Sequence, residues 1–191
     1  MGSEALGSRA QNGMRRMAEV MPALRSPLMK FYFGYLVPFN RRLGMRLESI
    51  ALDSGTVVLR LPYRRGNRNV AGTVHGAAIM ALAESVHGVT LAYGLREQHF
   101  GARIFTKSAQ LTYLKKASTD LWVRFAVEPS LLAQISSELH ARGKTLVSLS
   151  SLVTDQEGAA IARLEASYHV SWRPRPQSAT RVGPEPADLR A

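Results

Sequence analysis

Residues 75–92, HGAAIMALAESVHGVTLA, decide the fold of this chain. Ala, Ile, Met, Leu and Val occupy every side of a helical wheel drawn through the segment. A helix that is apolar all round has to be buried on all sides. At about 1.5 Å per residue it extends roughly 27 Å, the width of a small domain. The segment therefore predicts a long central helix that the rest of the chain encloses.

Strand-like segments lie on both sides of this helix in the sequence. Before it, 43–52 and 54–63 flank the turn Asp53-Ser54-Gly55, which predicts a β-hairpin. The strands expected after the helix are 103–114, 119–128, 131–140, 144–154 and 160–172. The turn Ala141-Arg142-Gly143 is expected to join two of these as a second hairpin. A curved antiparallel sheet wrapped around one apolar helix satisfies the burial demands of both, so the expected class is α+β.

The ends of the chain are expected to lie outside this domain. Two helical pieces are predicted at 14–25 and 27–37, with Pro27 well placed to open the second. The outermost residues are rich in Gly and Ser or in Pro and Arg, which predicts disorder. The expected divisions are a disordered N-terminus 1–13, a helical extension 14–42, the domain 43–172 and a disordered tail 173–191. Edge strands of such a sheet favour pairing with a second copy, so a homodimer is expected.

Composition narrows the class of protein further. The 191 residues contain no cysteine, which excludes disulfides, thiolate chemistry and zinc sites that need Cys. No stretch approaches the roughly 18 to 20 apolar residues of a membrane span, and the N-terminus does not read as a secretory signal. A mitochondrial transit peptide is a weaker alternative, because Pro22, Pro27 and Pro38 interrupt any long amphipathic helix. A cytoplasmic location is the default expectation.

The charge balance indicates an anionic partner. The net charge is +11, from 25 Lys and Arg against 14 Asp and Glu. Nucleic acid, anionic lipid and a phosphorylated cofactor all suit this surplus. The basic residues are spread over many segments without a dense run, which favours a small polyanion or plain solubility over a dedicated DNA-binding face.

Glu84 is the anomaly of the central helix, because it is the sole carboxylate on an otherwise apolar segment. Burying an unpaired charge costs several kcal/mol or shifts its pKa. Glu84 is therefore expected either to face a cavity or interface, or to pair with a basic residue. His87, three residues on, shares its helical face. His87 is expected to be a satisfied core histidine, with a hydrogen bond to Glu84 or to a substrate as the alternative.

The loop Asn69–Gly76, NVAGTVHG, leads into the helix. Gly72 allows a turn and a close approach to a ligand, and Thr73 is expected to cap the helix. Free backbone N–H groups near His75 and Gly76, with the helix dipole, suit a developing negative charge such as the oxyanion of thioester hydrolysis. Simple helix capping is the alternative, although it leaves Asn69 unexplained.

The spacing of His75 and Glu84 constrains any shared site. Nine residues place them about 13 Å apart along the axis and near opposite faces, so one carbonyl cannot touch both within a single copy. Two copies with antiparallel helices bring the helix start of one to the Glu of the other. The active site is then expected at the dimer interface, twice.

Other chemistries have no motif in the chain. The sequence has no Gly-x-Ser-x-Gly elbow, no Walker loop and no His-Glu-x-x-His. The five histidines show no metal-ligand spacing, so no metal site is predicted. Cofactors beyond a bound substrate are not expected.

Asn69-x-x-Gly72-Thr73-Val74-His75-Gly76, with an acidic residue nine after the His, resembles the phenylacetyl-CoA thioesterase-like branch of the hotdog superfamily. That superfamily also includes 4-hydroxybenzoyl-CoA thioesterases. The resemblance runs from about residue 43 to 172, and the segments at 105–117 and 141–168 are similar to the family's third strand and closing hairpin. It implies a hotdog fold, hydrolysis of an acyl-CoA, and a homodimer or a tetramer built as a dimer of dimers.

The resemblance also implies roles for single residues. Asn69 positions a water or the thioester, His75 shapes the loop, and the Gly76 N–H forms the oxyanion hole. Glu84 from the other subunit is nucleophile or general base, and Thr106 orients the water. The basic candidates for the CoA phosphates are Arg64, Arg65, Arg68, Lys115, Lys116, Arg142 and Lys144. Further substrate contacts are expected from Gly72, Met80, His87, Phe100, Phe105 and residues 27–37.

Two positions depart from the family pattern. The family often has His-Gly-Gly where this chain has His75-Gly76-Ala77, and Asp where it has Glu84. These departures keep a second hypothesis open, a non-catalytic hotdog protein that binds acyl-CoA or lipid. A hotdog dehydratase and a nucleic-acid binder are weaker alternatives. The leading hypothesis is an acyl-CoA thioesterase.

Overall fold

The computed structural model describes residues 25–51, 54–99 and 101–173. The N-terminal segment expected to be disordered, most of the helix expected at 14–25, Asp53, Phe100 and the tail from 174 lie outside the described residues. The helices are α2 Arg25–Phe31, the π-helical turn η2 Tyr32–Leu36, α3 Pro38–Leu43, the short η3 Arg65–Asn67, α4 Gly76–Gly94 and α5 Pro129–Arg142. The strands are β1 Arg46–Ile50, β2 Val57–Leu61, β3 Arg103–Tyr113, β4 Leu121–Phe125, β5 Lys144–Asp155 and β6 Ala160–Ser171.

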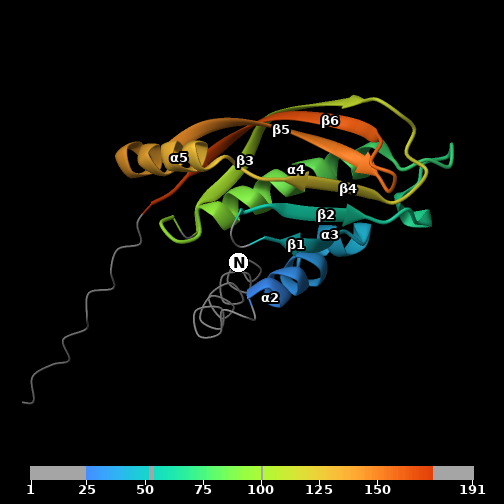
Figure 1. Cartoon of the computed structure of the whole chain (residues 1–191), viewed down its shortest axis with the longest axis horizontal. Coiled ribbons are helices and arrows are strands. Elements are labelled where there is room, and N and C mark those ends of the chain that lie inside the picture. The colour runs from blue at the N-terminus through green and yellow to red at the C-terminus, as the bar shows by residue number, and fades with distance from the viewer. Residues whose placement is uncertain (1–24, 52–53, 100, 174–191) are drawn as a thin grey trace, which may run out of the picture.

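The strands form one antiparallel sheet in the order β1-β2-β4-β5-β6-β3, curved around α4 (Figure 1). Helix α4 packs against β2, β3, β4, β5 and β6. Its buried side chains include Leu82, Val86 and Leu91, none of which is exposed to solvent. The predicted α+β fold with a long buried central helix is confirmed, because an all-apolar helix can be covered only by a sheet that bends around it.

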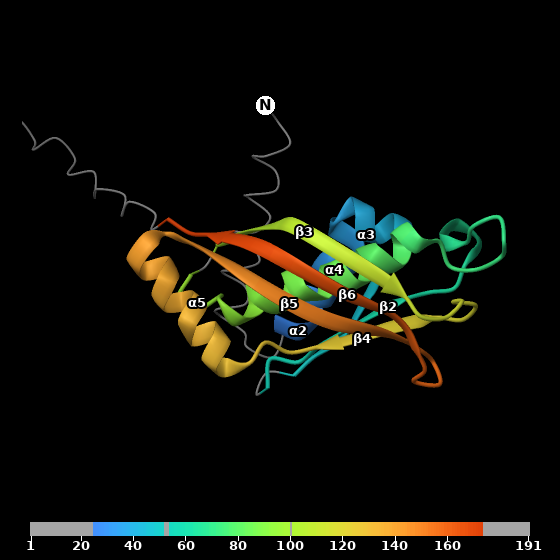
Figure 2. The ribbon, with the colours of Figure 1, turned by 90° about the horizontal axis from the view of Figure 1, so that it is seen from above.

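The alternation of residues along the strands gives the sheet its two faces. In β5 every second side chain is buried, from Thr145 to Val153, and those between are exposed. Successive side chains of a strand point to opposite faces, so one set packs toward α4 and the other faces outward. Figure 2 shows α4 lying along one side of the long strands.

The strand expected at 131–140 is wrong, because these residues belong to helix α5. Pro129 opens the helix, and Ile135 and Leu139 are buried four residues apart on one face. Gly143 ends it with a left-handed φ of 69°. The expected hairpin at 141–143 is therefore a helix–strand junction. The apolar period of this segment is that of a helix, which excludes a strand here.

The helical piece expected at 27–37 is confirmed in outline, although the helix changes type at Tyr32 and breaks at Val37. Pro38 restarts it as α3. Phe33 is buried, and the side-chain amide of Asn40 donates to its carbonyl at 3.1 Å. The segment packs beside β1 (Figure 1), and β1 is the edge of the sheet opposite β3.

Strand β3 is the long edge of the sheet. It pairs with β6 along its whole length, and its other side pairs with no strand among the described residues. In this strand of eleven residues, every second residue points its backbone N–H and C=O to the open side, which offers a template for another strand. Among the described residues, no helix combines the length and the apolar character needed to cross a bilayer.

Candidate active site

The loop before α4 is built on hydrogen bonds of its own. The Asn69 carbonyl oxygen Oδ1 accepts from the backbone of Ala71 and Thr73 at 3.0 and 3.1 Å, and its amide donates to the Thr73 hydroxyl at 2.9 Å. Gly72 has a φ of 76°, a conformation that favours glycine. Asn69 therefore fixes the conformation of the loop. This accounts for Asn69, which simple helix capping leaves unexplained.

Helix α4 begins with a different cap from the one expected. His75 is the N-cap, and its Nδ1 accepts from the Ala77 N–H at 3.1 Å. The prediction that Thr73 caps the helix is wrong, because Thr73 bonds back to Asn69 two residues too early. The His75 N–H donates to the Asn67 carbonyl at 2.7 Å, and the His75 carbonyl accepts from Ala78. These bonds leave the Gly76 N–H without a partner among the described residues.

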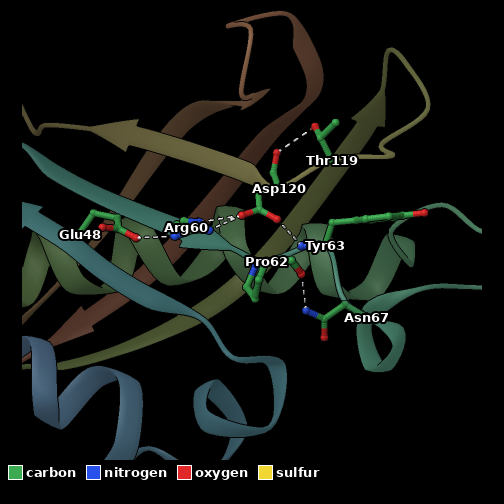
Figure 3. Close-up of polar contacts among 7 residues, drawn as sticks. All are labelled: Glu48, Arg60, Pro62, Tyr63, Asn67, Thr119 and Asp120. Carbon is green, nitrogen blue, oxygen red and sulfur yellow. Dashed lines mark hydrogen bonds and ion pairs between the residues drawn. The ribbon is translucent and has the colours of Figure 1, made fainter.

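A network of polar side chains holds the segment between β2 and this loop (Figure 3). The carboxylate of Asp120 accepts from the Tyr63 backbone N–H at 2.7 Å and from the Arg60 guanidinium. Arg60 also lies 3.7 Å from Glu48. The buried Asn67 donates to the carbonyls of Leu43 and Pro62, at 2.8 and 2.9 Å. Sequence reasoning missed Asp120 and Asn67, since their partners are distant in the chain.

Asp120→Asn is expected to lower the free energy of unfolding at pH 7 by about 1 to 3 kcal/mol. Partial burial raises the pKa of Asp120, but the Tyr63 N–H and Arg60 outweigh it and hold that pKa below its usual value. A depressed carboxyl pKa stabilises the fold above about pH 4 and loses its effect as the pH falls further. Urea unfolding measures the free energy of unfolding of both proteins at pH 7 and below pH 4. The difference between the two free energies should be smaller at the lower pH. An equal difference at both pH values would contradict this account.

A groove opens at the start of α4. Its lining joins the loop and helix to the segment after β3, and comprises Asn69, Thr73, Val74, Gly76, Ile79, Tyr113, Leu114, Lys115, Lys116 and Ala117. The Val74 N–H donates to the Ala117 carbonyl at 2.8 Å, which fixes the two segments side by side. Three predicted elements thus meet here, namely Asn69, the free Gly76 N–H, and two of the lysines proposed for phosphates.

Glu84 lies elsewhere on α4 and is half-buried. Its carboxylate accepts a hydrogen bond from the Thr106 hydroxyl of the edge strand β3. Glu84 does not line the groove, as its spacing from His75 predicts. Within one copy, the structure therefore joins Glu84 to Thr106 and separates both from Gly76.

His87 is a core residue. It is fully buried, its ring lies 4.5 Å from that of Phe125, and its Nδ1 is 2.9 Å from the hydroxyl of Tyr168. The hydrogen bond goes to Tyr168 rather than to Glu84. Its Nε2 has no partner among the described residues. Burial lowers the pKa of His87 to about 4, and burial together with Glu84 raises the pKa of Tyr168.

His87→Phe is expected to flatten the pH dependence of stability. In the chain that carries His87, the unfolded state binds a proton at this residue near pH 6.5, whereas the folded state binds it only near pH 4. The stabilisation is complete above about pH 6.5 and is lost as the pH falls toward 4, by about 2 to 3 kcal/mol at pH 4.5. Denaturant unfolding between pH 7 and 4.5 measures this slope. Equal slopes for both proteins would contradict the assignment.

Other expected substrate contacts are scattered. Met80 is half-buried against the core. Phe105 is 61% exposed on the outer face of β3, because its neighbour Thr106 points to Glu84 and successive side chains alternate, so its place in a pocket between two subunits stays a prediction. Lys144 pairs with Ser171 at the end of the sheet opposite Tyr113, about 30 Å along the strands. Arg142 and Lys144 therefore do not join the groove within one copy, whereas Arg68 is bridged to Val74 beside it.

The sequence matches the family model described as "Domain of unknown function (DUF4442)" over residues 25–170. The chain belongs to that family. Among solved structures, a protein of unknown function from Pseudomonas aeruginosa, named a probable thioesterase, is 26% identical with a TM-score of 0.69. The match covers 77% of this chain and 95% of that one.

Two further structures show the same fold at lower identity. A protein of unknown function from Chlorobaculum tepidum is 17% identical with a TM-score of 0.66, covering 77% of this chain and 94% of that one. Zebrafish thioesterase superfamily member 2 is 22% identical with a TM-score of 0.57, covering 74% and 94%. No curated protein sequence matches the chain.

The expected hotdog fold is therefore confirmed for this DUF4442 protein. The phenylacetyl-CoA branch within the superfamily stays a prediction. So do the roles of the site residues, for which the structure gives positions and hydrogen bonds. Among the described residues, no cluster of His, Asp or Glu could hold a metal ion.

Proposed function

We propose that this DUF4442 protein is an acyl-CoA thioesterase whose two active sites form between paired subunits. One observation carries the proposal, namely that Glu84 is held by Thr106 beside the open edge of β3. A carboxylate fixed by a single hydroxyl keeps acceptor capacity for a substrate or a water. The 26% identity to a probable thioesterase supports this class of reaction.

Pairing of two β3 edges completes the site. Antiparallel pairing of β3 with its copy reverses the direction of the second α4 relative to the first. The start of one helix then lies beside the middle of the other, which compensates for the spacing of nine positions from His75 to Glu84. Each groove with its free Gly76 N–H receives the partner subunit's Glu84.

In the proposed reaction, the Gly76 N–H acts at the carbonyl oxygen of the thioester, and Glu84 acts at the attacking water or at the carbonyl carbon. The Gly76 N–H and the positive end of α4 stabilise the oxyanion as the thioester carbonyl becomes tetrahedral. As a general base, Glu84 takes a proton from the water that attacks the carbonyl carbon. As a nucleophile, it attacks that carbon itself, and water later cleaves the resulting anhydride. In the base route the carbon–sulfur bond breaks as the proton held by Glu84 passes to the sulfur. In the nucleophile route that bond breaks to give the thiolate, which takes a proton from solvent, so CoA is released as its thiol in both.

The two lysines in the groove suit the anionic half of the substrate. Lys115 and Lys116 lie just after the end of β3 and line the groove with Gly76. Lysine ammonium groups bind phosphate as point charges, and CoA carries several phosphate charges. The net charge of +11 favours the same partner.

Thiol release from a panel of acetyl-, hexanoyl-, palmitoyl- and phenylacetyl-CoA tests the proposal. The purified full chain should turn over at least one of them, with a rate that increases in proportion to protein concentration. Binding of these compounds without turnover would overturn the thioesterase assignment. It would favour the non-catalytic acyl-CoA binder that the departures at Ala77 and Glu84 suggest.

A further inference from the structure

The hydroxyl of Tyr113 lies over Gly76 in the groove. A Cβ added to Gly76 would collide with the Tyr113 hydroxyl oxygen and would lie 3.0 Å from Cζ, the ring carbon that carries it. The Val74–Ala117 hydrogen bond holds the two segments together, so this approach is part of the fold. A glycine is needed at position 76 to admit the hydroxyl as well as a substrate.

The Tyr113 hydroxyl is free to donate. No hydrogen bond joins it to another residue in the described part of the chain, and the side chain is 55% exposed at the end of the edge strand. A tyrosine hydroxyl is a donor that usually finds a partner once it is covered. A substrate seated in the groove would cover this one, because Tyr113 is part of the lining.

The two free donors are close enough to share one oxygen atom. Standard bond lengths put a Cβ about 2.5 Å from its own nitrogen, so the hydroxyl that would collide with this Cβ lies within about 5 Å of the Gly76 nitrogen. One acceptor oxygen can bridge donors up to about 5.8 Å apart, because each hydrogen bond is about 2.9 Å long. A carbonyl oxygen between them would accept from both.

We propose that the Tyr113 hydroxyl is a second oxyanion donor, acting with the Gly76 N–H of the same subunit. The inference rests on the proposed thioesterase function. As water or Glu84 adds to the carbonyl carbon, the carbonyl π electrons move to oxygen, and both donors stabilise that charge. Tyr113 keeps its proton throughout, because the electrons return when the carbon–sulfur bond breaks.

Tyr113→Phe removes the hydroxyl and keeps the ring. With the acyl-CoA of the panel that is turned over fastest, kcat is expected to fall about 100-fold with KM unchanged, since one oxyanion donor contributes about 10²- to 10³-fold. Tyr93→Phe is the matched control, because it removes a hydroxyl from the last turn of α4, at the end of the helix opposite Gly76. It should keep the rate of the native chain, and both variants should keep its melting temperature.

The outcomes separate this inference from the function on which it rests. A native chain that turns over thioester, with a Tyr113→Phe variant of equal kcat, would overturn the role of Tyr113 alone. A rise in KM at unchanged kcat would also overturn it, because the hydroxyl would then bind the ground state. No turnover by the native chain across the panel would overturn the proposed function and this inference together.

Discussion

Glu84→Gln is expected to lower kcat for acyl-CoA hydrolysis by about 10³-fold or more. Gln has nearly the same shape, and its amide oxygen can still accept the hydrogen bond that Thr106 donates. It can neither take a proton from water nor attack a carbonyl carbon, so both routes open to Glu84 are lost. General bases contribute about 10²- to 10⁴-fold, and loss of a nucleophile costs at least as much. The rate of thiol release measures the effect.

Glu97→Gln is the matched control for this variant. Glu97 lies just beyond the end of α4, and its side chain is 73% exposed in an ion pair with Arg96. Such surface pairs contribute little to stability, so this variant should keep both the rate and the melting temperature of the native chain. If Glu84→Gln retained a tenth or more of the native rate, Glu84 would be neither base nor nucleophile.

Two inactive variants are expected to restore activity when their subunits are mixed. Gly76→Pro removes the oxyanion-hole N–H, and its ring displaces the Tyr113 hydroxyl that lies over Gly76, so the groove of that subunit loses both donors. Proline suits the first position of a helix, and His75 already has the extended ψ of 134° that precedes proline. Glu84→Gln leaves that N–H intact. In a mixed dimer one interface site carries both changes and the other carries neither. Random pairing of equal amounts makes half of the dimers mixed, so about one quarter of the native activity should return.

The control for this experiment reverses the expectation. The double variant, with both changes in one chain, is mixed with an equal amount of the native chain. If sites form between subunits, both sites of a mixed dimer are inactive, because each of them carries one of the two changes. Only the dimers of two native chains are then active, so about one quarter of the activity of an all-native sample remains. If each subunit holds a complete site, about half remains, and the two single variants restore nothing when mixed. That pair of results would contradict the interface site.

The sequence by itself determined the central helix and showed Glu84 to be the sole carboxylate on it. An 18-residue segment that is apolar all round fits only a buried helix, whatever surrounds it. The spacing of nine positions from His75 to Glu84 fixes their separation along the helix, because helical geometry is local and regular. The sequence also predicts the strands in which apolar and polar residues alternate, such as 144–154. Segment 131–140 was misassigned although its period and Pro129 were both present in the sequence.

Contacts between residues distant in the chain required the tertiary structure. Thr106 reaches Glu84 because a register shift in the β3–β6 pairing falls just after it, and Asp120 reaches the Tyr63 N–H across 57 residues. From the sequence, the Gly76 N–H is one of several backbone N–H groups that could stabilise an oxyanion. The hydrogen bonds of its neighbours in the structure show that it is free. Tyr113 had no distinguishing signal, since its hydroxyl meets Gly76 only when the end of β3 packs beside the start of α4. Local periodicity encodes which face of an element is buried, whereas the packing of elements decides which side chains share a site.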